Sequence, residues 1–283
     1  IDEVLDLDLV DVEAIKEAKF KVVVDGVNST GGMIVPMLLE RLGVHVVKLY
    51  CEPTGHFPHN PEPLKEHLGD ICKLVVEEHA DLGVVVDPDV DRLALIDEKG
   101  EMFGEEYTIV ACADYVLGEN QGNTVSNLSS SRALRDVTLK HGGAYYAAAV
   151  GEVNVVEKMK EVNAVIGGEG NGGVIYPALH YGRDSIVGVA LFLTHLAKKK
   201  ICVSALKAEY PLYFMSKKKI ELTPGLDVDK ILEAVAKKYK DEEISTVDGV
   251  KIDFRNHWIH LRKSNTEPII RIYTEAPSQQ EAD

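Results

Sequence analysis

Three carboxylates alternate in the segment that follows an apolar run at 83–86. Asp87, Asp89 and Asp91 are separated by single residues, and alternate side chains of an extended backbone point the same way. Such carboxylates repel each other unless a cation lies among them, and hard oxygen ligands at this density suit Mg²⁺ or Ca²⁺. Arg92 follows at once, so a fixed cation stands beside the expected metal. A metal with an arginine beside it stabilises a phosphoryl group during its transfer.

Three other interpretations of this acidic segment are open. The first is a solvated acidic turn after a strand, which needs no ligand. The second is an EF-hand with Glu98 at the twelfth loop position, but Arg92 stands where that loop needs glycine, and strands rather than helices flank the segment. The third is a phosphatase, in which Asp87 or Asp89 is a nucleophile placed directly after a strand.

The densest glycine cluster of the chain is the second candidate site, at 167–173. Glycine lets the backbone approach a ligand closely, and the only other side chains in the cluster are Glu169 and Asn171. A carboxylate can accept hydrogen bonds from two neighbouring hydroxyls, which suits a sugar ring. Arg183 and Asp184 follow, just before an expected helix. The alternative is a flexible turn with no ligand.

Basic and polar residues gather in a third segment near the end of the chain. Its members are Arg262, Lys263, Ser264, Asn265 and Thr266, with Arg271 on the strand that follows. Arginine, hydroxyl and amide groups around one tight loop suit a dianion such as phosphate. The alternative is a polar hairpin turn, but the net charge of the chain is −15, which makes a local basic cluster informative.

Strands and helices are expected to alternate along the chain and to hold these segments in place. For the first part we expect helices at 1–19, 33–42 and 64–80 and strands at 20–24, 44–49, 83–86 and 93–96. For the second part we expect helices at 107–117, 133–141, 151–161 and 186–197 and strands at 124–128 and 145–150. The pattern breaks at 210–219, where we place a boundary. For the last part we expect a helix at 228–239 and strands at 250–254, 258–261 and 269–273.

Three further motifs are given structural roles. The turn at 25–32 has the glycine spacing of a phosphate-binding P-loop, but Met33 stands where that motif needs lysine. The segment at 56–63 is rich in histidine and proline and lacks the spacing of a zinc site, so we expect a surface loop. Ser129–Ser131 is expected to cap the helix that follows.

Composition limits the class of the protein. The chain has 283 residues, of which 45% are hydrophobic and 27% charged, and a strongly negative net charge that argues against nucleic acid or an anionic membrane as partner. It has no long apolar segment that would span a membrane. The four cysteines are scattered and the first residues show no signal pattern, so we expect a cytoplasmic protein with reduced thiols. Nothing in the sequence indicates the oligomeric state.

Taken together, the three segments resemble the α-D-phosphohexomutase family, which includes phosphoglucomutase, phosphomannomutase and phosphoglucosamine mutase. Residues 87–92 resemble its metal loop, 168–173 its sugar-recognition loop and 262–268 its phosphate-binding loop. The order and separation of these loops imply the second, third and fourth domains of a four-domain enzyme.

The resemblance implies an α/β fold in three parts. Residues 1–100 and 101–212 are expected to form two consecutive α/β domains with mixed sheets. Residues 213–283 are expected to form a smaller α+β domain that binds phosphate and stops short of its usual length.

The implied reaction is a reversible shift of a phosphoryl group between positions 1 and 6 of a hexose, by way of a phosphoserine and a hexose bisphosphate. The implied cofactor is Mg²⁺, held by Asp87, Asp89 and Asp91, and the implied catalytic residue is Arg92. The residues implied to bind the hexose phosphate or bisphosphate are Glu169, Asn171, Arg183, Arg262, Ser264, Asn265, Thr266 and Arg271.

The sequence departs from the family pattern in several places. The phosphoserine motif, of the form Thr-x-Ser-His-Asn-Pro, does not occur in these residues, so we expect a fragment without the first domain that is inactive alone. Asn171 stands where many members have serine, and Gly173 where many have histidine. A Mg²⁺-dependent phosphatase and a sugar-phosphate binding module without catalysis are the alternatives.

Overall fold

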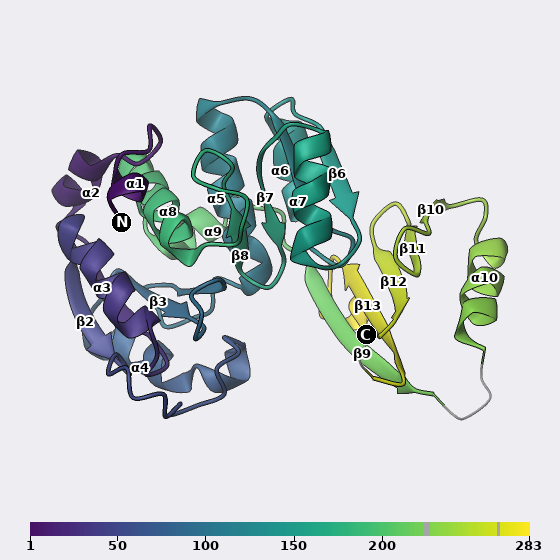
Figure 1. Ribbon diagram of the computed structural model, residues 1–283, viewed down its shortest axis with the longest axis horizontal. Coiled ribbons are helices and arrows are strands. Elements are labelled where there is room, and N and C mark those ends of the chain that lie inside the picture. Colours follow the sequence, from purple (N-terminus) through teal and green to yellow (C-terminus); the bar gives the residue numbers. More distant parts are fainter. Residues whose placement is uncertain (223–226, 265–266) are drawn as a thin grey trace.

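The computed structural model describes residues 1–222, 227–264 and 267–283, and the chain forms three sheets, one after another along the sequence (Figure 1). The first two sheets have four strands each and are covered by helices, and the third has five strands. We call the parts built on them the first, second and third units. This confirms the predicted fold class, two mixed α/β units followed by a smaller α+β unit.

The first unit has the strand order β2-β1-β3-β4. Strands β1, β2 and β3 are parallel, and β4 pairs with β3 in the antiparallel direction. The strands are β1 (Lys21–Asp25), β2 (His45–Leu49), β3 (Leu82–Val86) and β4 (Leu93–Ile96). The helices are α1 (Asp2–Leu5), α2 (Val12–Ala18), α3 (Gly31–Arg41) and α4 (Gly69–Glu77), with a 3₁₀ turn at Lys65–His67. Every residue of β3 is buried, as expected for an apolar strand inside a sheet covered on both faces.

The second unit repeats this plan with the strand order β6-β5-β7-β8. Again three strands are parallel and the last pairs antiparallel with its neighbour. The strands are β5 (Asn123–Asn127), β6 (Tyr145–Ala148), β7 (Ala164–Glu169) and β8 (Gly173–Ile175). The helices are α5 (Glu105–Glu119), α6 (Ala133–Lys140), α7 (Glu152–Glu161), α8 (Ser185–Lys199) and α9 (Val203–Lys207).

The repeated plan gives the first two candidate segments equivalent positions. The acidic segment joins β3 to β4, and residues 170–172 of the glycine segment join β7 to β8, so each forms the hairpin loop at the antiparallel edge of its sheet. The two hairpins touch through their backbones. The N–H of Leu93 donates to the carbonyl of Gly172 at 3.0 Å. The acidic loop is also held by α8, where the N–H of Ser185 donates to the carbonyl of Val90 at 3.0 Å.

The third unit is an antiparallel sheet with the order β10-β11-β12-β13-β9. The strands are β9 (Phe214–Glu221), β10 (Glu243–Ser245), β11 (Val250–Asp253), β12 (Trp258–Lys263) and β13 (Ile269–Ala276), with helices α10 (Val228–Lys238) and α11 (Gln279–Ala282). Figure 1 shows this unit at one end of the molecule, with its sheet beside the second unit. The third candidate segment joins β12 to β13 and is also a hairpin.

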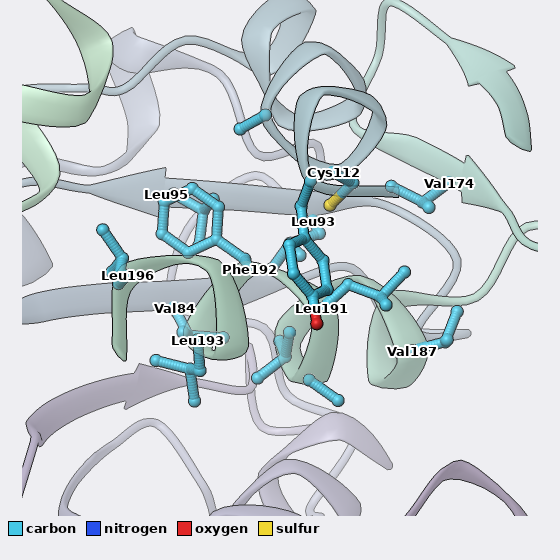
Figure 2. Packing of buried hydrophobic residues seen from close by; sticks show 14 of the residues in the cluster. Val84, Leu93, Leu95, Cys112, Val174, Val187, Leu191, Phe192, Leu193 and Leu196 are labelled. Atoms are coloured by element: carbon cyan, nitrogen blue, oxygen red, sulfur yellow. The ribbon is translucent and has the colours of Figure 1, made fainter. Parts of the chain in front are cut away.

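One hydrophobic core runs through the first two units, and helix α8 is its centre. Phe192 and Leu191 of α8 pack among residues of both sheets, including Leu93 of the first and Val174 of the second (Figure 2). The third unit has a separate cluster under α10. Among the described residues, no helix combines the length and the apolar content that crossing a bilayer requires.

The structure corrects three predicted elements. The helix expected at 1–19 is two helices, α1 and α2, separated by a turn. The helix expected at 64–80 begins only at Gly69 and ends at Glu77, because His79 takes a left-handed conformation with φ of 50°. The break expected at 210–219 contains most of β9, whose lysines hide it from a search for apolar strands.

Candidate active site

The three candidate loops meet around one cavity of about 600 Å³. Predicted residues from every unit line it: Arg92, Glu169, Asn171, Arg262, Ser264 and Arg271. Asn265 and Thr266 lie outside the described residues. The acidic and the basic loops lie far apart in the sequence, and the fold brings them to one site.

The acidic loop folds its three carboxylates together. One oxygen from each of Asp87, Asp89 and Asp91 lies within 4.8 Å of the others. The loop is closed by Oδ1 of Asp87, which accepts hydrogen bonds from the N–H groups of Asp91 at 3.0 Å and Arg92 at 3.1 Å. Val90 takes a φ of 63°, which is unusual for a β-branched residue and turns the chain between the second and third carboxylates.

These carboxylates fit a hard divalent cation. Burial raises the pKa of Asp87 to about 6, and the neighbouring charges of Asp91 and Asp89 add to the effect. Within the described chain, Oδ1 of Asp91 is buried without a hydrogen-bond partner. A cation among these oxygens would remove the repulsion and supply the missing partner, and three carboxylates are the donor set that Mg²⁺ accepts.

Arg92 stands between the acidic loop and the cavity. Its Nε lies 3.4 Å from Oδ2 of Asp87 and 3.8 Å from Oδ1 of Asp91, and its Nη1 lies 3.5 Å from Oε1 of Glu62. It lines both the large cavity and a smaller depression formed with Asp87 and Asp89. A phosphoryl group that entered the cavity next to the acidic loop would therefore meet this guanidinium.

Arg183 lies behind the cavity and joins the acidic loop to the glycine loop. Its guanidinium makes a close ion pair with Asp91, a hydrogen bond of 3.0 Å with Oε2 of Glu169, and a contact of 3.5 Å with Oε2 of Glu152. Arg183 is not among the residues that line the cavity. The expectation that Arg183 contacts a substrate stays a prediction, and in this structure its guanidinium positions the carboxylates of two loops.

Glu169 is fixed before any ligand binds. Its Oε1 accepts hydrogen bonds from Nδ2 of Asn127 at 2.7 Å and from the N–H of Gly151 at 3.2 Å, while Oε2 faces Arg183. The side chain is buried but still lines the cavity. The neighbouring Asn171 is held by its own turn, in which Oδ1 accepts from the N–H of Gly173 at 3.1 Å.

Two positions of this loop need glycine, because neighbouring atoms lie too close to leave room for a side chain. A Cβ on Gly170 would lie 1.7 Å from Oε2 of Glu106, and a Cβ on Gly172 would lie 2.5 Å from the carbonyl oxygen of Leu93. Gly172 also has a φ of +90°, which side chains rarely tolerate. The glycines thus let the loop lie against α5 and against the first unit.

The basic loop of the third unit is flanked by two arginines on paired strands. Arg262 and Arg271 are directly opposite each other on β12 and β13, an arrangement that destabilises a sheet unless an anion compensates it. Arg271 has an ion pair of 3.1 Å with Glu267. Arg262 has no ion pair within the described residues, and its Nε is buried without a hydrogen-bond partner there. Ser264 follows β12 directly and is buried, and its Oγ accepts from the N–H of Glu267 at 3.3 Å.

The serine run after β5 also faces the cavity, which the sequence interpretation missed. Ser131 does accept a hydrogen bond from the N–H of Ala133 at 3.2 Å, as a cap would. Ser129 and Ser130, however, line the cavity, and the predicted capping role is wrong for them. Their position at the carboxyl end of a parallel strand could have indicated a ligand site, because α/β sheets bind ligands at that edge.

Two further missed residues line the cavity, Glu106 at the start of α5 and Lys217 on β9. Neither belongs to a motif. Glu106 is one of two adjacent glutamates, and Lys217 is one of three consecutive lysines. Such runs of like charge are typical of a solvated surface, so the sequence does not indicate a site at either residue. Only the packing of the third unit on the second brings them together.

Comparison with known proteins agrees with this geometry. The chain matches three successive domains described as phosphoglucomutase/phosphomannomutase: alpha/beta/alpha domain II over residues 1–100, alpha/beta/alpha domain III over 104–213 and the C-terminal domain over 218–283. It is 41% identical over 278 residues to a phosphoglucomutase/phosphomannomutase of Thermococcus kodakarensis, covering 96% of this chain and 60% of that protein.

Other relatives carry related names. A phosphoglucosamine/phosphogalactosamine mutase of Sulfurisphaera tokodaii is 32% identical over 280 residues, which are 97% of this chain and 62% of that protein. The chain thus spans about 60% of the length of these curated relatives.

Solved structures share the fold. A phosphoglucomutase/phosphomannomutase family protein of Burkholderia thailandensis superposes with a TM-score of 0.84 at 27% identity, covering 96% of this chain and 60% of that one. An N-acetylphosphoglucosamine mutase of Aspergillus fumigatus, solved in complex with GlcNAc-6P and magnesium, superposes with a TM-score of 0.66 at 15% identity, covering 96% and 66%.

Proposed function

Because the chain belongs to the phosphoglucomutase/phosphomannomutase family, we propose that its cavity binds a hexose phosphate and that the whole protein moves a phosphoryl group between positions 1 and 6 of the sugar. The proposed route passes through a phosphoserine and a hexose bisphosphate. The part of these 283 residues in that reaction is to hold the metal ion, the sugar ring and the phosphate that is not reacting.

The observation that carries this proposal is that three loops with different functional groups meet at one cavity. The first unit brings an arginine beside three carboxylates, the second brings a fixed carboxylate and an amide, and the third brings two arginines. A hexose bisphosphate has the matching chemistry, with hydroxyls at its centre and a dianion at each end. A simple phosphatase would leave the arginines of the third unit without a purpose.

We assign the metal position to Asp87, Asp89 and Asp91. Magnesium bound there would neutralise the charge on a transferring phosphoryl group. Arg92 would contact the same group from the cavity side, since it lines both the cavity and the acidic depression. Both hydrogen bonds that close the loop end on Oδ1 of Asp87, which favours a role as a held ligand over that of a nucleophile.

We assign the sugar hydroxyls to Glu169 and Asn171. Glu169 is already held by Asn127 and Gly151, so little conformational freedom is lost when a sugar binds. Arg183 keeps the carboxylate of Glu169 in place and ties it to Asp91. The phosphate that is not reacting would lie against Arg262, Ser264 and Arg271, with Asn265 and Thr266 proposed from the sequence alone.

A calorimetric titration with glucose 1,6-bisphosphate in the presence of Mg²⁺ tests the proposal. We expect the chain to bind this probe and Arg262→Ala to weaken the binding roughly ten-fold or more, because a charge-assisted contact contributes about 1.5–3 kcal/mol. Lys218→Ala is the matched control, since Lys218 lies in the same sheet with its side chain on the other face.

Two results would count against the proposal. Absence of binding by the unaltered chain would remove the hexose-phosphate assignment. Equal losses in the Arg262 and Lys218 variants would show that the third unit attracts the anion only through its general charge.

A further inference from the structure

An ion pair on the cavity wall joins the third unit to the second. Nζ of Lys217, on β9, lies 3.4 Å from Oε1 of Glu106 and 3.6 Å from Oε1 of Glu105, both in the first turn of α5. Lys217 and Glu106 line the same cavity as the arginines of the basic loop. Neither side chain has a part in the function proposed above.

The register of the third sheet places Lys217 on the face that carries the two arginines. Lys217 is opposite Tyr273 on β13, and Arg271 is two residues from Tyr273 on that strand. Residues two apart on a strand share a face, and Arg262 is opposite Arg271 on β12. Lys217, Arg271 and Arg262 therefore lie on one face of three neighbouring strands, and all three line the cavity.

The same face is turned toward the second unit. His260 continues the row of Lys217 and Tyr273 onto β12, and its Nδ1 lies 2.9 Å from Oγ of Ser129, which lines the cavity. The side chain of Lys217 is 41% exposed, so the ammonium can change partners without unfolding the strand.

Glu106 is held in the cavity wall as a counter-charge. Its Oε2 accepts a hydrogen bond from the N–H of Ser131 at 2.9 Å, and its side chain is only 11% exposed. Burial raises the pKa of Glu106 to about 7, against the opposing influence of Lys217. A carboxylate in this place repels an entering phosphate. It also pairs with the lysine ammonium that could otherwise bind the phosphate.

We propose that Lys217 is a further phosphate-binding residue of this cavity, and that Glu106 holds its ammonium when no anion is bound and lowers the affinity for the anion. This rests on the proposed phosphate site at Arg262 and Arg271. The ligand is the dianionic phosphate of a sugar phosphate. On its arrival the ammonium exchanges a carboxylate partner for a phosphate oxygen, and no bond to carbon or phosphorus changes.

The two residues are tested by variants with opposite expected effects, measured by calorimetric titration with glucose 1,6-bisphosphate. Lys217→Met keeps the apolar stem and should weaken binding about five-fold or more, since it removes a charge-assisted contact. Glu106→Gln keeps an oxygen to accept from Ser131 and should tighten binding roughly three-fold, because it removes a like charge and frees the ammonium. Lys217→Arg should bind within about two-fold of the unaltered chain.

Lys218→Met is the matched control, because Lys218 is the next residue on β9, faces the other way and pairs with the terminal Asp283 at 3.8 Å. Equal effects of the Lys217 and Lys218 variants would overturn the inference for Lys217. Weaker binding by Glu106→Gln would overturn the role given to Glu106. If Arg262→Ala loses affinity while Lys217→Met does not, only this inference fails; if the unaltered chain does not bind the probe, the proposed function fails with it.

Discussion

At the scale of single residues, each carboxylate of the acidic loop has a different environment. Asp87 is buried and holds the loop closed, and Asp91 is paired with two arginines from different units. Asp89 is exposed, and its side chain makes no hydrogen bond or ion pair within the described chain. Asp89 is therefore the member whose loss should affect the metal and leave the loop folded.

We expect Asp89→Ala to weaken Mg²⁺ binding about ten-fold or more in a calorimetric titration, because one of three charged ligands is removed. The melting temperature without Mg²⁺ should stay unchanged. Asp241→Ala, which removes an exposed carboxylate from the third unit, is the control for net charge. Mg²⁺ binding that is equal in the two variants would place the metal elsewhere.

At the scale of elements, the sequence predicted the strands and loops that carry unusual composition. The apolar run before Asp87 is a buried strand, as predicted. The glycine cluster contains the expected turn, but its first three residues end β7 and its last residue begins β8. Strand β9 was missed because it is an edge strand with exposed lysines, and edge strands often carry charge to discourage pairing with other chains. The roles of Glu106 and Arg183 were also beyond reach, since they depend on partners brought close only by the fold.

Helix α8 carries a buried group that should make stability depend on pH. Burial lowers the pKa of His195, neither ring nitrogen has a hydrogen-bond partner within the described residues, and Nε2 lies 3.7 Å from Oδ2 of Asp114. A histidine whose pKa is lower in the folded state takes up its proton more readily when unfolded. Its contribution to stability is thus present above pH 6.5 and is lost as the pH falls below that value.

We expect the free energy of unfolding to fall by about 1 kcal/mol or more between pH 7 and pH 5 because of His195. Chemical denaturation at several pH values measures this. In His195→Gln the same interval should show a smaller fall, since the variant cannot titrate. A fall of equal size in both proteins would assign the pH dependence to other groups.

At the scale of the whole molecule, the first two units share a core and the third is attached mainly by polar groups. Arg132, in the loop after β5, is buried and donates to carbonyl oxygens in the turn between β11 and β12. Its Nη2 also lies 3.1 Å from Oδ1 of Asp253, and its N–H donates to Glu275 at 3.0 Å. Glu275 in turn accepts from Nε1 of Trp258 at 2.8 Å.

We expect Arg132→Met to destabilise the attachment of the third unit by about 3 kcal/mol, because it leaves the buried carboxylate of Glu275 without its cation, while Asp253 keeps only Lys251. Trp258 is the single tryptophan and is fully buried, so its fluorescence reports this region directly. The emission should shift to the red at lower denaturant concentration in the variant. Arg132→Met combined with Glu275→Gln should recover part of the lost stability. A double variant that loses as much stability as the two single variants together, or more, would contradict this account.

The equivalent positions of the acidic and glycine hairpins have a consequence for how such a protein can change over time. Two sheets of the same strand order present their antiparallel edges to each other, and the chemistry of each is confined to one short connection. We expect mutation of an exposed side chain in such a connection, as at Asp89, to leave the sheet that carries it folded. The backbone contact between Leu93 and Gly172 nevertheless couples the two hairpins. Substitutions that change the sugar preference in one hairpin would therefore be accompanied by compensating substitutions in the other.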